Sequence, residues 1–374
     1  MRLRKLSLHG FRNLCDRELD VPAEGVAILG RNAQGKTNLL EAIAYLETFR
    51  SFRGASDDRL VRFGEDVFRL AGELRPDGTD GGARTVSAGY QVGSRTKRVR
   101  VDGEVQPRLG DAIGVVGTVL FTPRDVRLVT DGPAERRRFL DIVLSLNDAD
   151  YLAALQRFRQ SLAQRNAALR EPGAPVGAWE GAMLRWGAEV TRARAAWVAE
   201  ATEGFARHYQ EVFGSASAFL RYEPSIFGVS GSSDSETVLG AYEDALEAAR
   251  EAERRRGVTL VGPHRDELKI EVGLPDGETV DAREYGSGGQ RRTAALALRL
   301  AEAETLRRRR RREPILLLDD VFAELDEERS TRLLELLDRA VPGQVILTAP
   351  KEGDVRFRRD VLPRWSIEAG EVTP

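Results

Sequence analysis

One eight-residue segment of the chain has the composition of a phosphate-binding loop. It carries glycine at its first and sixth positions, followed by a lysine and a threonine, and reads Gly30, Arg31, Asn32, Ala33, Gln34, Gly35, Lys36 and Thr37. The segment matches the pattern G-x-x-x-x-G-K-[ST], in which the glycines permit a tight loop whose amides point at phosphate oxygens. In that pattern Lys36 would reach the outer phosphates, and the hydroxyl of Thr37 would coordinate Mg²⁺.

The sequence on either side of this loop fits the same interpretation. A short apolar run, Val26–Leu29, comes before it, and a helical pattern follows from Lys36 to about Phe49. The amino end of a helix favours bound anions, because its free amides and its dipole both attract them. An ordinary glycine-rich turn is the alternative, and these flanking elements favour nucleotide binding over it.

Two consecutive acids end a second apolar run. Ile315–Leu318 is followed directly by Asp319 and Asp320. P-loop enzymes hold Mg²⁺ with a carboxylate at the end of a buried strand, so we assign Asp319 to the metal. Asp320 is then placed to orient or deprotonate the attacking water, which makes Asp320 and Lys36 the candidate catalytic residues. The alternative is a core strand that ends in solvated acids. That alternative is common when such a run occurs alone, and the phosphate loop in the same chain argues against it.

Composition excludes several other kinds of site. The single cysteine, Cys15, rules out an internal disulfide and a cysteine zinc cluster, and three scattered histidines argue against a histidine-rich metal site. No apolar run is long enough to span a membrane, and the charged start of the chain is unlike a signal peptide. We therefore expect a cytoplasmic protein with no membrane partner.

The charge balance leaves nucleic-acid binding open. Of the 57 basic residues 52 are Arg, while the net charge is only −2. Arginine binds phosphate in a bidentate manner, although its excess also fits a bias in base composition. A neutral total does not exclude a local basic face.

Periodicity divides the chain into three parts. Short strand patterns and one helix fill residues 1–125, which we assign as the first lobe of an α/β head. Helical spacing, broken near 172–177, indicates a helical insert over residues 126–256. Strand patterns at Val258–Val261 and Leu268–Val272, a long helix from Gly289 to about Arg311 and a further helix from Arg329 follow, so residues 257–374 form the second part of the head.

A short glycine-rich segment opens the long helix that precedes the two acids. This segment consists of Ser287, Gly288, Gly289 and Gln290 and is called the signature segment below. The order of phosphate loop, signature segment and acids resembles ATP-binding-cassette ATPases. The resemblance implies that Ser287–Gln290 contact ATP held by a second copy of the chain, so that ATP joins a homodimer.

The chain departs from the common cassette pattern at three places. Ala323–Asp326 resembles the loop that crosses the dimer interface in this class, with Ala323 where Ser is common. Thr348 and Ala349 stand where many cassette ATPases carry a catalytic histidine, and no clear glutamine occurs near residues 121–123. We therefore expect slow ATP hydrolysis.

Further motifs resemble one family within this class, the RecF family of bacterial recombination-repair ATPases related to SMC heads. The motifs are Gly10–Asn13, Lys36–Ile43, Phe121–Asp125, Gly132–Asp141 and Gly262–Asp266. The resemblance covers nearly the whole chain and implies an α/β fold, namely an ATP-binding-cassette (SMC-like head) P-loop ATPase domain with an inserted helical domain. It also implies ATP and Mg²⁺ as cofactors, weak DNA-stimulated ATP hydrolysis, and ATP-dependent dimerisation on double-stranded and gapped DNA. RecO and RecR are the implied partners in loading RecA at single-strand gaps, with roles in replication and the SOS response.

Two other classes of protein remain as alternatives. A nucleotide-binding subunit of an ATP-binding-cassette transporter would normally be shorter, with the histidine and glutamine that this chain lacks and without its insert. A nuclease-fused repair ATPase would need an additional acidic metal-binding domain, which we do not find.

Several arginines and one histidine have both structural and functional interpretations. The run Arg307–Arg312 is expected to be a solvated helix end that complements the helix dipole. Arg136, Arg137 and Arg138 are better candidates for phosphate contacts, although at least one could form a structural ion pair. We expect His264 to be a structural hydrogen-bonding residue and Cys15 to be a small buried or semi-exposed residue without redox function.

Overall fold

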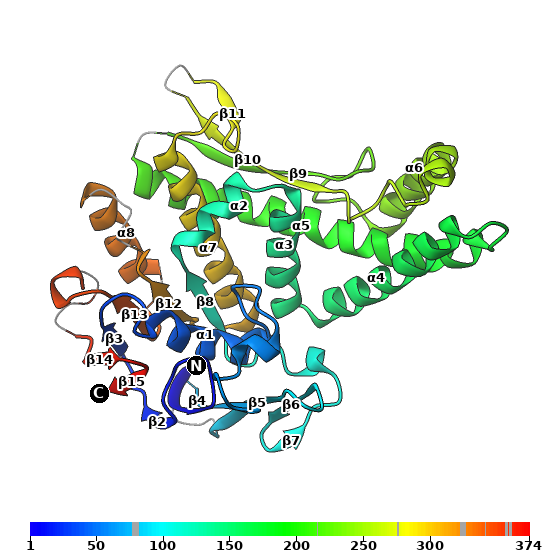
Figure 1. The fold of residues 1–374 in the computed structure, drawn as a ribbon. Helices are drawn as coiled ribbons and strands as arrows, with labels where there is room; N and C mark the ends of the chain where they lie inside the picture. Colours follow the sequence, from blue (N-terminus) through cyan, green and yellow to red (C-terminus); the bar gives the residue numbers. More distant parts are fainter. Residues whose placement is uncertain are drawn as a thin grey trace. The chain divides into compact units, whose positions relative to one another are not determined.

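The computed structural model describes residues 1–76, 82–214, 216–274, 277–321, 327–340, 342–355, 358 and 361–374. The chain divides into two compact units (Figure 1). The first unit combines Met1–Arg124 with Glu302–Pro374, and the second spans Asp125–Ala301. Each unit is built around its own cluster of buried apolar side chains.

A mainly parallel sheet organises the first unit. Among the described residues its strand order is β15-β14-β3-β13-β12-β8, and only β15 runs antiparallel to its neighbour. The three central strands are almost wholly apolar and buried, as expected for a sheet covered on both faces. The strands are β3 (Gly25–Leu29), β8 (Thr118–Phe121), β12 (Ile315–Asp319), β13 (Val345–Ala349), β14 (Arg364–Glu368) and β15 (Glu371–Thr373).

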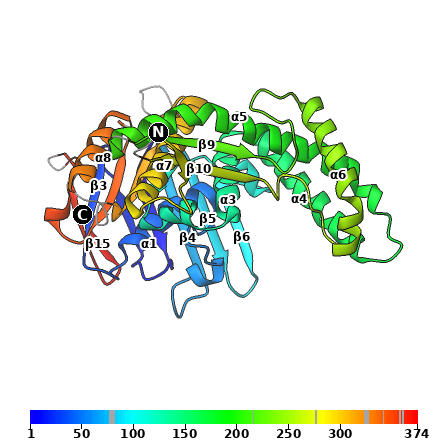
Figure 2. The same cartoon turned by 90° about the horizontal axis from the view of Figure 1, so that it is seen from above.

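A second, antiparallel sheet completes the first unit. Its order is β2-β1-β4-β5-β6-β7 over the residues that the structure describes. Buried and exposed residues alternate along β4, the pattern of a strand with one face on the core. Figure 2 shows β4, β5 and β6 of this sheet from above. They are β1 (Arg2–His9), β2 (Arg17–Asp20), β4 (Val67–Arg75), β5 (Arg84–Gln91), β6 (Thr96–Val101) and β7 (Glu104–Val105).

One buried helix and one buried amide join the two sheets. Helix α1 (Lys36–Thr48) packs against strands of both sheets, and most of its residues are buried. The side chain of Gln344, just before β13, accepts a hydrogen bond from the Leu3 amide at 2.8 Å and donates to the Leu3 carbonyl at 2.9 Å. Helix α8 (Glu327–Ala340) also belongs to this unit.

Helices dominate the second unit. The long helices α4 and α5 pack side by side, and α6 packs against α5 (Figures 1 and 2). Asp148 caps α4 by accepting hydrogen bonds from two amides of its first turn, and Asp234 caps α6 in the same way through the Thr237 amide. The helices are α2 (Arg127–Thr130), α3 (Pro133–Asn147), α4 (Ala149–Arg170), α5 (Glu180–Phe213), α6 (Ser235–Arg256) and α7 (Gly288–Arg310), the last of which continues into the first unit.

The second unit also contains a sheet, of which the sequence predicts only the strand at Leu268–Val272. Strands β9 (Ala218–Glu223), β10 (Glu267–Gly273) and β11 (Thr279–Asp281) pair antiparallel in the order β11-β10-β9. Because β9 lies inside the predicted helical insert and pairs with β10, the compact unit extends past residue 256 to Ala301. The boundary predicted at residues 256 and 257 therefore differs from the division that the contacts define.

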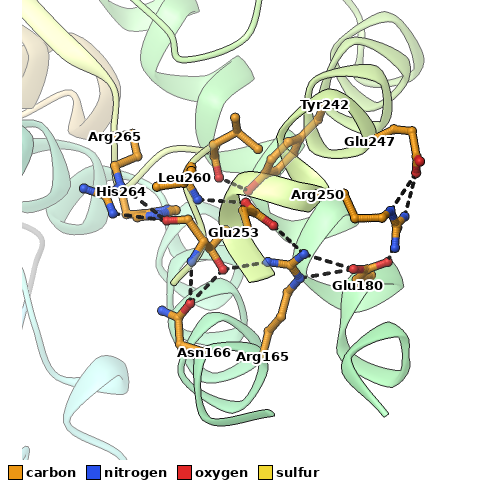
Figure 3. Close-up of polar contacts among 12 residues, drawn as sticks. Arg165, Asn166, Glu180, Tyr242, Glu247, Arg250, Glu253, Leu260, His264 and Arg265 are labelled. Atoms are coloured by element: carbon orange, nitrogen blue, oxygen red, sulfur yellow. Dashed lines mark hydrogen bonds and ion pairs between the residues drawn. The ribbon is translucent and has the colours of Figure 1, made fainter. Parts of the chain in front are cut away.

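The strand predicted at Val258–Val261 is wrong, and buried side chains explain why. The Thr259 amide donates to Asn166 Oδ1 and the Leu260 amide donates to Glu253 Oε1, each at 2.8 Å (Figure 3). Side chains of α4 and α6 thus bind the amides that a neighbouring strand would otherwise bind. A segment with a strand-like apolar pattern forms a strand only where another strand is available to pair with it.

A buried ion pair lies beneath this segment. Arg165 and Glu253 are both almost completely buried, and Arg165 Nη2 lies 2.7 Å from Glu253 Oε2. The same guanidinium donates to Thr259 Oγ1 at 2.8 Å and to Glu180 Oε1 at 3.0 Å (Figure 3). The pair therefore joins α4, α5 and α6 to the segment after α6.

No helix among the described residues has the length and apolar character needed to cross a lipid bilayer.

Removing one member of the buried pair should destabilise the protein strongly. We expect Arg165→Met to lower the free energy of unfolding by about 3–5 kcal/mol, because Glu253 would stay buried without its cation. The matched control is Arg255→Met on α6, whose partner Glu251 is exposed, and there the change should stay within about 0.5 kcal/mol. Urea unfolding followed by circular dichroism measures both, and equal effects would contradict the assignment.

Candidate nucleotide-binding site

The carboxyl ends of three parallel strands meet at one edge of the first unit's parallel sheet. The phosphate loop follows β3, the two acids end β12, and Thr348 lies near the end of β13. Strand register aligns Asp319 with Thr348 and Ala349 with Leu29. This edge is where open α/β sheets bind their ligands. The structure therefore brings together the predicted residues of the phosphate loop and of β12.

The phosphate loop has the backbone conformation that its glycines were predicted to permit. Gly35 has a φ of 118°, and a Cβ at Gly30 would lie 2.5 Å from the Ile367 carbonyl oxygen. Ala33 also has a positive φ, 66°, which is uncommon outside glycine. Helix α1 starts at Lys36, directly after the loop, so its first amides face the loop.

The loop closes around the ammonium group of Lys36. Its Nζ donates to the carbonyl oxygens of Gly30 at 2.5 Å and Arg31 at 3.1 Å. Burial lowers the pKa of Lys36, while the nearby carboxylates of Asp320 and Asp319 act in the opposite direction. The ammonium group thus lies against the loop backbone and within electrostatic range of the two acids, where it can bind a phosphate charge.

Thr37 and Asp319 are in direct contact although they are far apart in sequence. Thr37 Oγ1 donates to Asp319 Oδ1 at 3.0 Å, and Thr348 Oγ1 donates to the same oxygen at 2.9 Å. Burial raises the pKa of Asp319, and the two hydroxyl hydrogen bonds oppose that rise. A buried carboxylate whose charge is only partly balanced is well suited to receive a cation.

These groups fit a magnesium ion. Mg²⁺ prefers oxygen ligands and usually takes one or two from the protein, with phosphates and water supplying the rest. A carboxylate and a hydroxyl 3.0 Å apart satisfy this preference. The described residues contain no group of three or more histidine, cysteine or acidic side chains able to hold a metal alone. Thr37 and Asp319 offer two oxygen ligands, so phosphate and water would supply the remaining ligands of a magnesium ion here.

Asp320 differs from its neighbour in backbone conformation. Its φ is 50°, in the left-handed region, whereas Asp319 still belongs to β12. The Asp320 amide donates to Thr348 Oγ1 at 3.2 Å. The chain thus leaves the strand conformation between the two acids, which gives consecutive carboxylates different surroundings.

A group of arginines beside the loop was not recognised as a group from the sequence. Glu41 of α1 is fully buried and accepts hydrogen bonds from Arg12 Nε at 2.9 Å, Arg53 Nη2 at 2.6 Å and Ser51 Oγ at 2.5 Å. Burial alone would raise the pKa of Glu41, but these hydrogen bonds outweigh it and hold the pKa below its usual value. Only Arg12 belongs to a motif that the sequence singled out, since Arg53 lies in a loop without a distinctive pattern.

The arginines line a hollow next to the phosphate loop. Asn13 connects the hollow to the loop, because its Nδ2 donates to the Gln34 carbonyl at 3.3 Å and its Oδ1 accepts from Asn38 at 2.7 Å. The hollow has a volume of about 560 Å³. Its lining consists of Arg12, Asn13, Asn38, Arg53, Arg59, Val61, Arg62 and Phe63. It can receive an anionic or polar ligand that extends from the loop.

The signature segment lies in the second unit and forms a capping box. The Gln290 amide donates to Ser287 Oγ at 3.2 Å, and the Ser287 amide donates to Gln290 Oε1 at 2.8 Å. Gln290 Nε2 also donates to the Gly273 carbonyl at 3.3 Å. The serine oxygen thus acts as an acceptor, which leaves its proton for an acceptor such as phosphate. The dimer-interface loop predicted at Ala323–Asp326 lies outside the described residues.

The arginines of α3 have different environments. Arg136 is buried and pairs with Glu267, with Nε–Oε1 and Nη2–Oε2 distances of 2.9 Å. Arg137 is half-buried and donates to the Asp266 carbonyl at 2.9 Å, whereas Arg138 is exposed. The structural ion pair expected for at least one of the three is therefore that of Arg136, and Arg136 is not available to bind phosphate.

The remaining interpretations can also be compared with the structure. His264 Nε2 lies 3.0 Å from the Thr259 carbonyl, and burial lowers the pKa of His264 to about 4, so the ring is neutral at pH 7 and its contacts are structural. Arg307–Arg309 are exposed as expected, but Arg310 and Arg312 both donate to the Gly114 carbonyl. Cys15 is exposed rather than buried.

Comparison with known proteins identifies relatives over the whole chain. Residues 2–364 match the model of the RecF/RecN/SMC N-terminal domain. The chain is 39% identical to the DNA replication and repair protein RecF of Frankia alni, over 100% of this chain and 99% of that protein. It is 37% identical to the protein of the same name from Anaeromyxobacter sp., with the same two shares covered.

Comparison with solved structures gives the same family as the sequence matches. The recombination mediator protein RecF-ATPrS in the RecFOR pathway matches with a TM-score of 0.89 at 30% identity, over 100% of this chain and 97% of that chain. An Smc head bound to the C-winged helix domain of ScpA matches with a TM-score of 0.57 at 15% identity, covering 100% and 96%, which shows the fold alone. The predicted α/β fold of an SMC-like ATPase head is thereby confirmed, and the chain belongs to the RecF family.

Proposed function

We propose that this chain is an ATP-dependent DNA-binding protein of replication and recombination repair, with weak ATPase activity. The observation that carries the proposal is the 3.0 Å hydrogen bond between Thr37 and Asp319, because it brings the phosphate loop and the predicted metal ligand to one point. The relatives named DNA replication and repair protein RecF support the biological setting. Two similar solved structures, named RecF-ATP and RecF-ATPrS, support ATP as the nucleotide.

The residues of the first unit would divide the chemistry as follows. The loop amides and Lys36 bind the phosphates, while Thr37 and Asp319 hold Mg²⁺. When bound, the metal neutralises charge on the transferred phosphoryl group. Asp320 orients the attacking water or takes its proton. Hydrolysis would be slow because Thr348 and Ala349 stand where many cassette ATPases carry a catalytic histidine.

The signature segment would complete the site of a second copy. Its serine proton and the free amides at the start of α7 suit a phosphate that is held elsewhere. ATP bound by one copy would thereby join two copies into a dimer. The same reasoning gives Gly288, Gly289 and Gln290 a supporting role at this helix start.

DNA would bind the dimer through its phosphates. We infer that duplex and gapped DNA are the ligands, and that the chain acts with RecO and RecR to load RecA at single-strand gaps. The similar structures belong by name to the RecFOR pathway, which supports these partners. The comparisons favour this function over a subunit of a membrane transporter.

Substitutions of the two acids should impair different steps, namely ATP binding for Asp319 and ATP hydrolysis for Asp320. Asp319→Asn should weaken Mg²⁺-dependent ATP binding, because it removes the carboxylate charge at the metal. Asp320→Asn should bind ATP normally but hydrolyse it at least about 100-fold more slowly, within the range for loss of a general base. Equilibrium ATP binding with and without Mg²⁺, together with phosphate release, distinguishes the two. An equal loss of ATP affinity in both variants would refute the division of roles.

Ser287→Arg should separate ATP binding from dimerisation. The variant should bind ATP as a monomer, because the phosphate loop and the two acids are unchanged, while the start of α7 loses its serine cap and gains a bulky cation. Lys36→Ala is the matched control, since it should lose ATP binding and dimerisation together. Sedimentation with ATP and Mg²⁺ measures both, and an ATP-dependent dimer of Ser287→Arg would rule out action across the interface.

DNA affinity should depend on salt more steeply with ATP than without it. The slope of log affinity against log salt is about −0.9 for each phosphate neutralised on duplex DNA, so a dimer that joins two basic surfaces steepens it. Arg138→Ala combined with Arg265→Ala should flatten the slope, because both residues are exposed. Arg138 follows Arg137 in α3, and Arg265 lies within electrostatic range of Arg137. The control is Arg255→Ala, an exposed arginine of α6. A salt series on two unrelated duplexes tests this, and an ATP-independent slope would oppose the model.

A further inference from the structure

Thr348 lies between the two halves of the nucleotide site. The strand order is β3-β13-β12, so the strand before the phosphate loop and the strand before the acids are not neighbours. Adjacent strands lie about 4.8 Å apart, which separates β3 from β12 by roughly 10 Å. Thr348 is buried near the end of β13, the strand between them. From this position the Thr348 side chain can reach the two acids at the end of β12.

The hydroxyl of Thr348 contacts both acids at once. Its Oγ1 donates to Asp319 Oδ1 at 2.9 Å and accepts from the Asp320 amide at 3.2 Å. A threonine hydroxyl has one donor and can accept, so both capacities are used here. The main-chain pairing of β12 and β13 already sets their register. The hydrogen bond from Thr348 Oγ1 to Asp319 Oδ1 is therefore not needed to align the two strands.

These two contacts have separate effects on the acids. Thr37 and Thr348 donate to the same oxygen of Asp319, so rotation of that carboxylate would break both hydrogen bonds. The second contact holds the amide of Asp320 where the backbone turns into the left-handed region. A non-glycine residue keeps such a conformation only when its surroundings enforce it.

We propose that Thr348 is a positioning residue for ATP hydrolysis that assigns the two adjacent acids to different tasks. It holds Asp319 against Thr37 for the metal and fixes the turn that presents Asp320 to the water. This inference rests on the proposed function, because it presumes that Mg²⁺ and ATP bind at this edge of the sheet. Groups that orient metal ligands typically matter by about 10–100-fold in metal affinity or activity.

The test replaces the hydroxyl without changing the shape of the side chain. Thr348→Val removes both hydrogen bonds but keeps the branched side chain, and Thr348→Ser restores the hydroxyl. We expect Thr348→Val to need at least about 10-fold more Mg²⁺ for tight ATP binding, and to hydrolyse ATP at least 10-fold more slowly at saturating Mg²⁺. Thr348→Ser should stay close to the wild type in both measurements. Thr348→Ala is the second variant without a hydroxyl, for use if Thr348→Val does not fold.

A buried threonine of the same sheet provides the control. Thr118 begins β8 and pairs with Ile315, at the opposite end of β12 from the acids. Thr118→Val should leave the Mg²⁺ requirement unchanged, and thermal unfolding of all variants without nucleotide reports any general loss of stability. Binding of a fluorescent ATP analogue across a Mg²⁺ series gives the requirement independently of turnover.

The outcomes separate this inference from the proposed function. If the wild type shows no Mg²⁺-dependent ATP binding, the proposed function itself fails. If the wild type binds as expected and the variants without the hydroxyl match it, Thr348 has no positioning role. Equal losses in Thr118→Val, or a loss in Thr348→Ser as large as in Thr348→Val, would also overturn the inference, because the effect would then reflect packing alone. A loss confined to Thr348→Val and Thr348→Ala supports it.

Discussion

One carboxylate oxygen, Asp319 Oδ1, connects the parts of the first unit that the nucleotide site requires. It accepts hydrogen bonds from Thr37, after β3, and from Thr348 of β13, while Asp319 itself ends β12. Three strands that are distant in sequence must therefore end at the same level of the sheet. Their pairing is parallel and their side chains are apolar, so the buried sheet fixes that level. The polar site is a consequence of the apolar core beneath it.

Charge in the second unit is used to fix local structure. Arg165 and Glu253 are buried together. Arg165 donates to the Thr259 hydroxyl oxygen, and Glu253 accepts a hydrogen bond from the Leu260 amide. A buried ion pair often adds little net stability relative to apolar residues, because both charges must be desolvated. Removing one member of the pair nevertheless lowers stability strongly, because the other charge stays buried without a partner. Such a pair therefore suits the task of holding an irregular segment in one conformation, here the segment that leads into Gly262–Asp266.

Local patterns predicted the elements of the first unit well and the polar contacts poorly. The apolar runs before Gly30 and Asp319 each form a buried strand, because short apolar runs suit strands of a parallel sheet that is covered on both faces. The strand at Val258–Val261 failed because its amides bind side chains that lie 93 and 7 positions away. Arg53 was not singled out for the same reason, and Thr348 was noted only as standing, with Ala349, where a catalytic histidine is common. Their importance comes from Glu41 and Asp319, which only the fold brings near.

Thr348 also connects the expected slow hydrolysis with the architecture of the site. Histidine changes its charge near neutral pH, so it can stabilise or move a proton during the reaction, whereas a threonine hydroxyl cannot titrate there. In this chain the hydroxyl is already engaged on both sides, by Asp319 and by the Asp320 amide. A hydroxyl with both hydrogen bonds in use can orient the acids, but it cannot also bind the phosphate during the reaction. The proposed site therefore favours holding ATP in a defined geometry over rapid turnover, and a long-lived ATP-bound state is what the proposed dimer would require.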